Sequence, residues 1–109
     1  MPALTLPDPI AAYFAADTQG PDEVARCFTP GGVVKDNGRT HAGREAIRAW
    51  KADTSTLYTY TSEPFSVNLV DDVHVVRSHT VGSFPGSPID LELCFRLERG
   101  LIAKLEITA

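Results

Sequence analysis

The 109-residue chain lacks the features that mark nucleic-acid-binding and membrane proteins. Ten Lys and Arg stand against fourteen Asp and Glu, which gives a formal net charge of −4, and the basic residues form no cluster. A mildly acidic chain of this kind is a poor binder of nucleic acid or anionic membranes. No apolar run approaches the roughly 20 residues that span a bilayer. The N-terminal residues show neither the positive region nor the apolar core of a signal peptide, so we expect a cytoplasmic protein.

Metal-binding and cofactor-binding patterns are also missing. The two cysteines, Cys27 and Cys94, are far apart in an apolar pattern, which indicates reduced core residues rather than a disulfide or metal clip. His74 and His79 are five residues apart on an expected strand, so they point to opposite faces and cannot chelate one ion together. No spacing matches a zinc or iron site, a phosphate loop or a dinucleotide fingerprint. We therefore expect no metal and no cofactor.

What the chain does have is enough apolar residues for a real core. Hydrophobic residues make up 43% of the sequence, and its length fits one domain over residues 1–109. No internal repeat, linker or low-complexity segment interrupts it.

The first half of the chain predicts helices. Asp8 as N-cap and Pro9 as the first helical residue predict a helix with an apolar stripe of Ile10, Tyr13 and Phe14. A second helix begins at Pro21, repeats the stripe spacing with Val24, Cys27 and Phe28, and ends at Pro30-Gly31-Gly32.

A short strand and a third helix follow. Residues 33–36 predict a strand stub that ends in Asp36, and Asn37-Gly38 predicts a turn. The third helix runs from residue 43 to about residue 53. Its expected inward residues are Ala46, Ile47 and Trp50, and its expected outward residues are Arg44, Glu45, Arg48 and Lys51.

After residue 55 the hydrophobic period changes to two, which predicts strands over residues 57–69, 73–84, 87–97 and 101–108. Glu63-Pro64 interrupts the first of them, so we expect a bulge there. Helices followed by antiparallel strands predict an α+β fold with the helices on one face of a curved sheet. Alternation predicts that the helices cover Leu91, Leu93, Phe95 and Leu97, and likewise Leu101, Ala103, Leu105 and Ile107.

This order of elements resembles the nuclear transport factor two-like superfamily, and most closely its SnoaL-like and ketosteroid isomerase-like group. The segments that carry the resemblance are Tyr13-Phe14, Phe28-Thr29-Pro30, Val34-Lys35-Asp36, Gly43-Arg44-Glu45-Ala46-Ile47 and residues 95–102. The resemblance implies a cystatin-like roll, in which three N-terminal helices and a curved antiparallel or mixed sheet form a cone with an internal cavity. It also implies a homodimer formed through the outer face of the sheet.

The resemblance also implies roles for particular residues. Asp36 falls where ketosteroid isomerases keep their catalytic base, and Tyr13 falls near their oxyanion-hole tyrosine. Leu93 stands where those enzymes have a protonated carboxylic acid, so the second donor is missing and a steroid isomerase is not expected.

Each candidate has a plainer interpretation. A carboxylate held against apolar walls becomes a better base near neutral pH, but Asp36-Asn37-Gly38 is also ordinary turn chemistry. Tyr13 could donate to a developing oxyanion or could be a core tyrosine. His79 could be an acid-base partner of Asp36 if its face of the strand is the inner one, and otherwise it is a solvent or interface residue. The sequence does not decide whether His74, Tyr58 and Tyr60 lie on the inner or the outer face of the sheet.

These residues and the family resemblance together imply a function. We expect a protein that binds a small apolar, possibly cyclic, metabolite, with Asp36, Tyr13 and His79 as candidate catalytic residues. A catalytic form would be a cofactor-independent cyclase, isomerase or dehydratase; the alternative is a non-catalytic ligand-binding or dimerisation module with a filled cavity. The expected ligand-contacting residues are Phe14, Phe28, Trp50, Leu93, Phe95 and Leu105.

Overall fold

The structure is a computed structural model that describes residues 5–109. Six strands form one mixed sheet in the order β2-β1-β6-β5-β4-β3, in which β1 and β6 are parallel and all other neighbours antiparallel. The elements, in chain order, are α1 (Asp8–Asp17), α2 (Pro21–Arg26), β1 (Phe28–Asp36), β2 (Arg39–Ala42), α3 (Arg44–Leu57), β3 (Tyr60–Val70), β4 (Val73–Gly82), β5 (Ile89–Glu98) and β6 (Leu101–Thr108).

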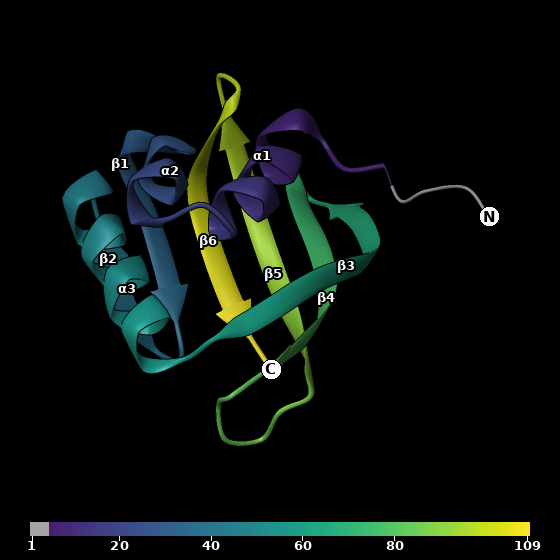
Figure 1. The fold of residues 1–109 in the computed structure, drawn as a ribbon. Coiled ribbons are helices and arrows are strands. Elements are labelled where there is room, and N and C mark those ends of the chain that lie inside the picture. The colour runs from purple at the N-terminus through teal and green to yellow at the C-terminus, as the bar shows by residue number, and fades with distance from the viewer. Residues whose placement is uncertain (1–4) are drawn as a thin grey trace.

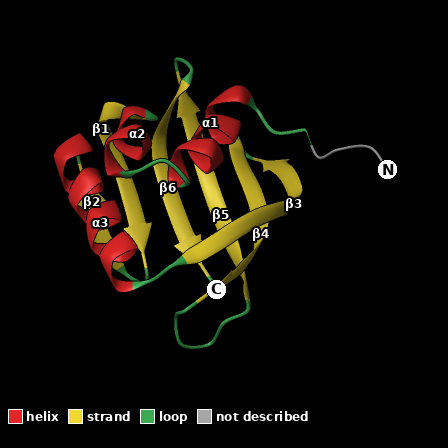
Figure 2. Cartoon of the chain, in the orientation of Figure 1, coloured by secondary structure: helices red, strands yellow, loops and turns green. Residues whose placement is uncertain are grey.

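All three helices lie on one side of this sheet, and the sheet curves towards them at its β3 and β4 side (Figures 1 and 2). α3 packs against β1 and β2, and α1 packs against β6. The α+β fold class expected from the sequence is confirmed. None of the helices in residues 5–109 has the length and apolar content needed to cross a membrane.

The helix ends differ from the prediction. The N-cap of α1 is Pro7, so Asp8 is the first helical residue and not the cap. α2 ends at Arg26, and Phe28 opens β1 instead of completing a helical stripe. The strand stub is therefore a nine-residue strand that includes the Pro30-Gly31-Gly32 segment.

A bulge explains how a strand accommodates this segment. The pairing of β1 with β6 shifts register between Phe28 and Val33. At Gly32 an added Cβ would lie 3.0 Å from the Phe28 Cβ and 3.1 Å from the Thr29 carbonyl oxygen, so glycine allows the close approach. The sequence pattern suggested a helix stop, because proline and glycine mark a bulge and a helix end alike.

The region after the Asn37-Gly38 turn holds a second difference. The turn is confirmed, with Asn37 and Gly38 at φ of 52° and 79°. The polar residues that follow it form β2, an edge strand that the sequence analysis missed. α3 then continues to Leu57, so β3 begins only at Tyr60.

Lys51 corrects the predicted outer face of α3. Its side chain is buried, with 1% of the residue exposed, although the sequence analysis placed it outward. It lies four residues after the buried Ile47 but only three after the exposed Arg48, so the helical period places it at the border of the buried face and does not decide its burial. The structure supplies buried polar partners for its ammonium group, which no local pattern reveals.

The strands follow the expected alternation except at the start of β6, where Leu101 was predicted to face the helices but pairs with Glu98 and points away from them. Leu93, Phe95 and Leu105 are buried as predicted, and the pairing of β3 with β4 shifts between Pro64 and Ser66, which confirms the expected bulge. Ile102 is also fully buried, although it was assigned to the outer face. The register of β5 and β6 shifts between Arg96 and Leu97, and this irregularity brings Ile102 onto the same side as Leu105.

Candidate functional site

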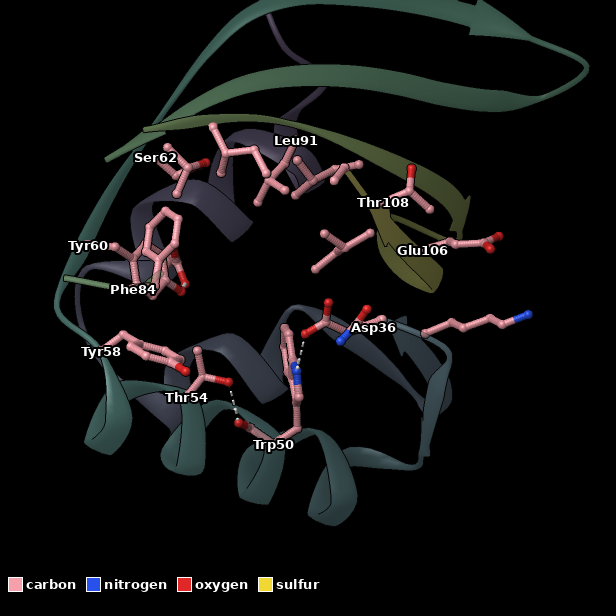
Figure 3. Close-up of a pocket in the computed structure, with 18 of the residues that line it drawn as sticks. Asp36, Trp50, Thr54, Tyr58, Tyr60, Ser62, Phe84, Leu91, Glu106 and Thr108 are labelled. Carbon is pink, nitrogen blue, oxygen red and sulfur yellow. Dashed lines mark hydrogen bonds between the residues drawn. The ribbon is translucent and has the colours of Figure 1, made fainter. Parts of the chain in front are cut away.

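A pocket of about 720 Å³ opens between the helices and the curved sheet (Figure 3). A volume of this size is typical of small-molecule sites. Its lining combines aromatic and aliphatic side chains with a few polar groups: Tyr13, Phe14, Asp17, Lys35, Asp36, Asn37, Gly38, Trp50, Thr54, Tyr58, Tyr60, Ser62, Thr80, Phe84, Pro85, Ile89, Leu91, Leu93, Glu106, Ile107, Thr108 and Ala109.

Asp36 enters this pocket from the end of β1. Its backbone is held on both sides, by Arg39 of β2 and by Ile107 of β6, before the chain turns at Asn37. The indole N–H of Trp50 donates a hydrogen bond of 3.0 Å to Oδ2 of the half-buried Asp36 side chain (Figure 3). This bond fixes the carboxylate and leaves Oδ1 available to accept a proton or a hydrogen bond.

Tyr13 lies on the inner face of α1 and also lines the pocket. Its ring packs edge-on against Phe14 and Phe95, each at 5.4 Å between centroids. Burial, helped by the charge of Asp17, raises the pKa of the Tyr13 hydroxyl well above 10.0. No hydrogen bond among residues 5–109 uses this hydroxyl, so it is available as a protonated donor on a residue that lines the pocket.

A second polar group lies in the wall formed by α1, α3 and β3. The Lys51 ammonium group contacts both Oδ1 of Asp17 and the hydroxyl of Tyr60. The Tyr60 hydroxyl donates to the same Asp17 oxygen at 3.1 Å. Burial, followed by the charge of Asp17, raises the pKa of Tyr60, which keeps it a donor. We call these three residues the Asp17–Lys51–Tyr60 cluster. The sequence analysis left the face of Tyr60 undecided and did not identify Asp17 or Lys51 as a site residue.

The predicted ligand-contacting residues divide into two sets. Phe14, Trp50 and Leu93 line the pocket. Phe28, Phe95 and Leu105 are completely buried in the core behind it and do not line it. Alternation identified the inner face for the strand residues, but an inner-face residue can be closed off by helices as easily as it can face a pocket.

His79 lies outside the pocket. Val76, Ser78 and Thr80 are buried on the inner face of β4, so His79 points from the other face. Its Nδ1 lies 2.8 Å from Oδ1 of Asp90, and half of its side chain is exposed. It is therefore not placed to exchange protons with Asp36.

The other undecided residues are placed as well. Tyr58 and Tyr60 both line the pocket. His74 lies on the opposite face of β4 from His79. It shares the inner face with Val76 but does not line the pocket. Among residues 5–109, no three His, Cys, Asp or Glu side chains gather in a way that could hold a metal ion.

Solved structures show which family has this fold. A proposed polyketide cyclase from Sinorhizobium meliloti is 38% identical in sequence and superposes with a TM-score of 0.89, covering 94% of this chain and 95% of that protein. The chain belongs to the SnoaL-like, ketosteroid isomerase-like group of the nuclear transport factor two-like superfamily. No family model matches the chain, and neither does any curated protein.

More distant members of the superfamily share the fold. A Catenulispora acidiphila protein with a ketosteroid isomerase-like fold, solved with trimethylamine, is 23% identical, has a TM-score of 0.84 and covers 96% of this chain and 87% of its own. TerC, co-crystallised with polyporic acid, is 16% identical, has a TM-score of 0.78 and covers 92% of this chain and 87% of its own. The SnoaL-like chain thus shares its fold with proteins that were crystallised with small molecules.

Proposed function

We propose that this SnoaL-like protein binds an apolar, ring-containing metabolite and moves a proton at a carbon next to a carbonyl group, without a cofactor. The observation that carries the proposal is the position of Asp36. One of its oxygens is held by Trp50, and the carboxylate lies at a pocket of about 720 Å³ with largely aromatic and aliphatic walls (Figure 3). Such a setting suits a general base, because the hydrogen bond from Trp50 orients the carboxylate and its free oxygen can reach a bound ligand.

Each step of the proposed reaction uses a group already described. Oδ1 of Asp36 accepts the proton, and the electron pair of the broken C–H bond forms an enolate. The Tyr13 hydroxyl donates a hydrogen bond to the enolate oxygen, and because its pKa is raised it does so while protonated. Return of this proton from Asp36 to another carbon gives isomerisation. Attack of the enolate on a second carbonyl, with the proton passing from Asp36 to the new alkoxide, gives cyclisation. Loss of a hydroxyl group from the β-carbon as water, with the proton supplied by Asp36, gives dehydration.

Non-catalytic binding of the same kind of ligand is the second candidate. Leu93 lines the pocket at the position where, by the family resemblance, a protonated acid would assist Tyr13. An enolate oxygen that accepts a hydrogen bond from Tyr13 alone is stabilised less than one that accepts from two donors. The pocket volume favours either form of binding over a module whose interior is filled by side chains.

Deuterium exchange separates catalysis from binding. 2-Tetralone in D2O exchanges its α-protons slowly in buffer, and proton NMR follows the loss. We expect the wild-type protein to accelerate this exchange and Asp36→Asn to lower the acceleration by about 100-fold or more. The exposed carboxylate of Asp53 on α3 provides the control, and Asp53→Asn should exchange at the wild-type rate. Equal exchange by wild type and Asp36→Asn would rule out Asp36 as the base, and saturable binding without exchange would favour the second candidate.

We also propose that the protein forms a homodimer and that it is located in the cytoplasm. The helices leave the outer face of the sheet uncovered, which is the face that the resemblance assigns to a dimer (Figure 1). Sedimentation should then give twice the 11.8 kDa of one chain, and a monomer at micromolar concentration would contradict the proposal. Fractionation of the source cells tests the location.

A further inference from the structure

The Asp17–Lys51–Tyr60 cluster joins three elements at one wall of the pocket. Asp17 ends α1, Lys51 lies in the middle of α3 and Tyr60 opens β3. The side chains of Lys51 and Asp17 are only 2% and 10% exposed. Asp17 and Tyr60 line the pocket, whereas Lys51 lies behind them.

The hydrogen bonds of the cluster leave one group unused. The ion pair with Lys51 and the hydrogen bond from Tyr60 both end on Oδ1 of Asp17. The Tyr60 hydroxyl is already both donor and acceptor, because it donates to Asp17 and accepts from Lys51. Within the cluster, the acceptor that no hydrogen bond uses is therefore Oδ2 of Asp17, a residue that lines the pocket.

Charge decides which donor suits this oxygen. Lys51 compensates the charge of Asp17, so an ammonium group on the ligand would meet a pair that is already neutral, with a buried cation behind it. A neutral hydroxyl group needs only the acceptor and leaves the ion pair intact. A ligand without any donor would leave Oδ2 desolvated and without a partner, which disfavours its binding.

We infer that Asp17, supported by Lys51 and Tyr60, forms a second polar subsite that recognises a hydroxyl group on the ring system of the substrate. The inference rests on the proposed function and narrows its substrate class. The substrate is a hydroxylated cyclic ketone: its carbonyl group lies with Tyr13 and Asp36, and its hydroxyl group donates to Oδ2 of Asp17. The two polar positions fix which way round the ring system enters a pocket whose remaining walls are largely apolar.

A purely structural role is the alternative for the cluster. It ties α1, α3 and β3 together, and a cluster that only did so would leave ligand preference unchanged when removed. Replacing a buried ion pair with apolar residues of similar size is often neutral or stabilising, so the pair can be removed as a unit. The Asp17→Leu/Lys51→Met variant does this without leaving a lone buried charge.

The chain offers a matched control. Asp22 and Arg48 form another acid–base pair between helices, at 3.8 Å, but both side chains are largely exposed. Asp22→Leu/Arg48→Met makes the same chemical changes away from the pocket. Circular dichroism and urea unfolding establish that each double variant is folded.

The probes are hydroxy-2-tetralones that differ in the position of the hydroxyl group, their methyl ethers and the parent 2-tetralone. Trp50, the single tryptophan, lines the pocket, and its fluorescence reports binding. We expect one hydroxyl isomer to bind the wild type about tenfold more tightly than its methyl ether, which keeps the oxygen but cannot donate. The Asp17→Leu/Lys51→Met variant should lose this preference and still bind the parent compound, and the control variant should retain the preference.

The outcomes distinguish this inference from the proposed function. Exchange and binding of the parent ketone without any hydroxyl preference would overturn the subsite alone. A preference that survives in Asp17→Leu/Lys51→Met would overturn its assignment to Asp17. Failure of every ketone to bind the wild type would contradict both proposals.

A measurement on the wild-type protein covers the case in which the double variant does not fold. In the complex with the preferred isomer, nuclear Overhauser effects should connect the ligand protons beside the hydroxyl group to the Tyr60 ring. Contacts from those protons to Trp50 instead would overturn the inference.

Discussion

Tyr13 illustrates how burial adapts a single residue to a site. Its ring is held by aromatic neighbours, its hydroxyl faces the pocket, and burial raises the pKa of that hydroxyl above its ordinary value of 10.0. A raised pKa in the folded state makes the stability of the protein depend on pH. Below about pH 10 both states keep the hydroxyl protonated. Above it, only the unfolded chain ionises, so stability falls as the pH rises towards the folded-state pKa.

This dependence gives a prediction for Tyr13→Phe. A tyrosine that stays protonated in the folded state lowers the free energy of unfolding by about 1.4 kcal/mol for each pH unit above the pKa that it has in the unfolded chain. Between about pH 9 and pH 11, Tyr13→Phe should therefore lose about 1 kcal/mol less stability than the wild type, as measured by urea unfolding. Equal losses in the two proteins would show that Tyr13 is not buried as described.

The sequence predicted part of the site at this scale and missed the rest. Asp36, Tyr13, Phe14, Trp50 and Leu93 were singled out, and all five line the pocket. Lys51 was assigned to the outer face of α3 because a lysine on a helix is usually exposed. What buries it is the pairing with Asp17 and Tyr60, which are 34 and 9 residues away, and no local periodicity contains that information.

Among the secondary-structure elements, α3 carries one buried and one exposed cationic side chain. Lys51 is buried against Asp17, whereas the Arg48 side chain is 46% exposed beside Asp22 and Glu45. Lys51→Met would leave the Asp17 carboxylate buried without its cation and should cost about 3–5 kcal/mol. Arg48→Met should cost at most about 1 kcal/mol. Urea unfolding of both variants makes the comparison, and similar small costs for the two would show that the buried ion pair contributes little.

Element boundaries were predicted least well where one signal has two meanings. Pro30-Gly31-Gly32 indicated a helix end but forms a strand bulge, and Ile102 lies on the core face because of a register shift in β6. The bulge at Pro64 was predicted correctly, because a proline inside a clear strand pattern cannot donate to the ladder and is confined to bulges and edges.

At the scale of the whole molecule, the order of helices and strands was enough to predict the α+β fold, and the resemblance named the family. The pocket could not be predicted in this way. Phe28, Phe95 and Leu105 fill the core whereas Leu93 reaches the pocket, although Leu93, Phe95 and Leu105 all belong to the inner face of the sheet. The spacing between the sheet and the helices at each position decides between these outcomes, and that spacing depends on all the elements together.

The claim that this pocket holds an apolar ring is tested most directly by titrating the protein with 2-tetralone and monitoring the fluorescence of Trp50. Leu91 lines the pocket, and Leu57 at the end of α3 is 69% exposed, so Leu91→Gln and Leu57→Gln make the same change inside and outside it. We expect the wild type and Leu57→Gln to bind 2-tetralone saturably. Leu91→Gln should bind it about tenfold more weakly, because a polar amide replaces an apolar side chain in the pocket wall. Absence of saturable binding, or equal affinity in all three proteins, would contradict the claim that this pocket holds an apolar ring.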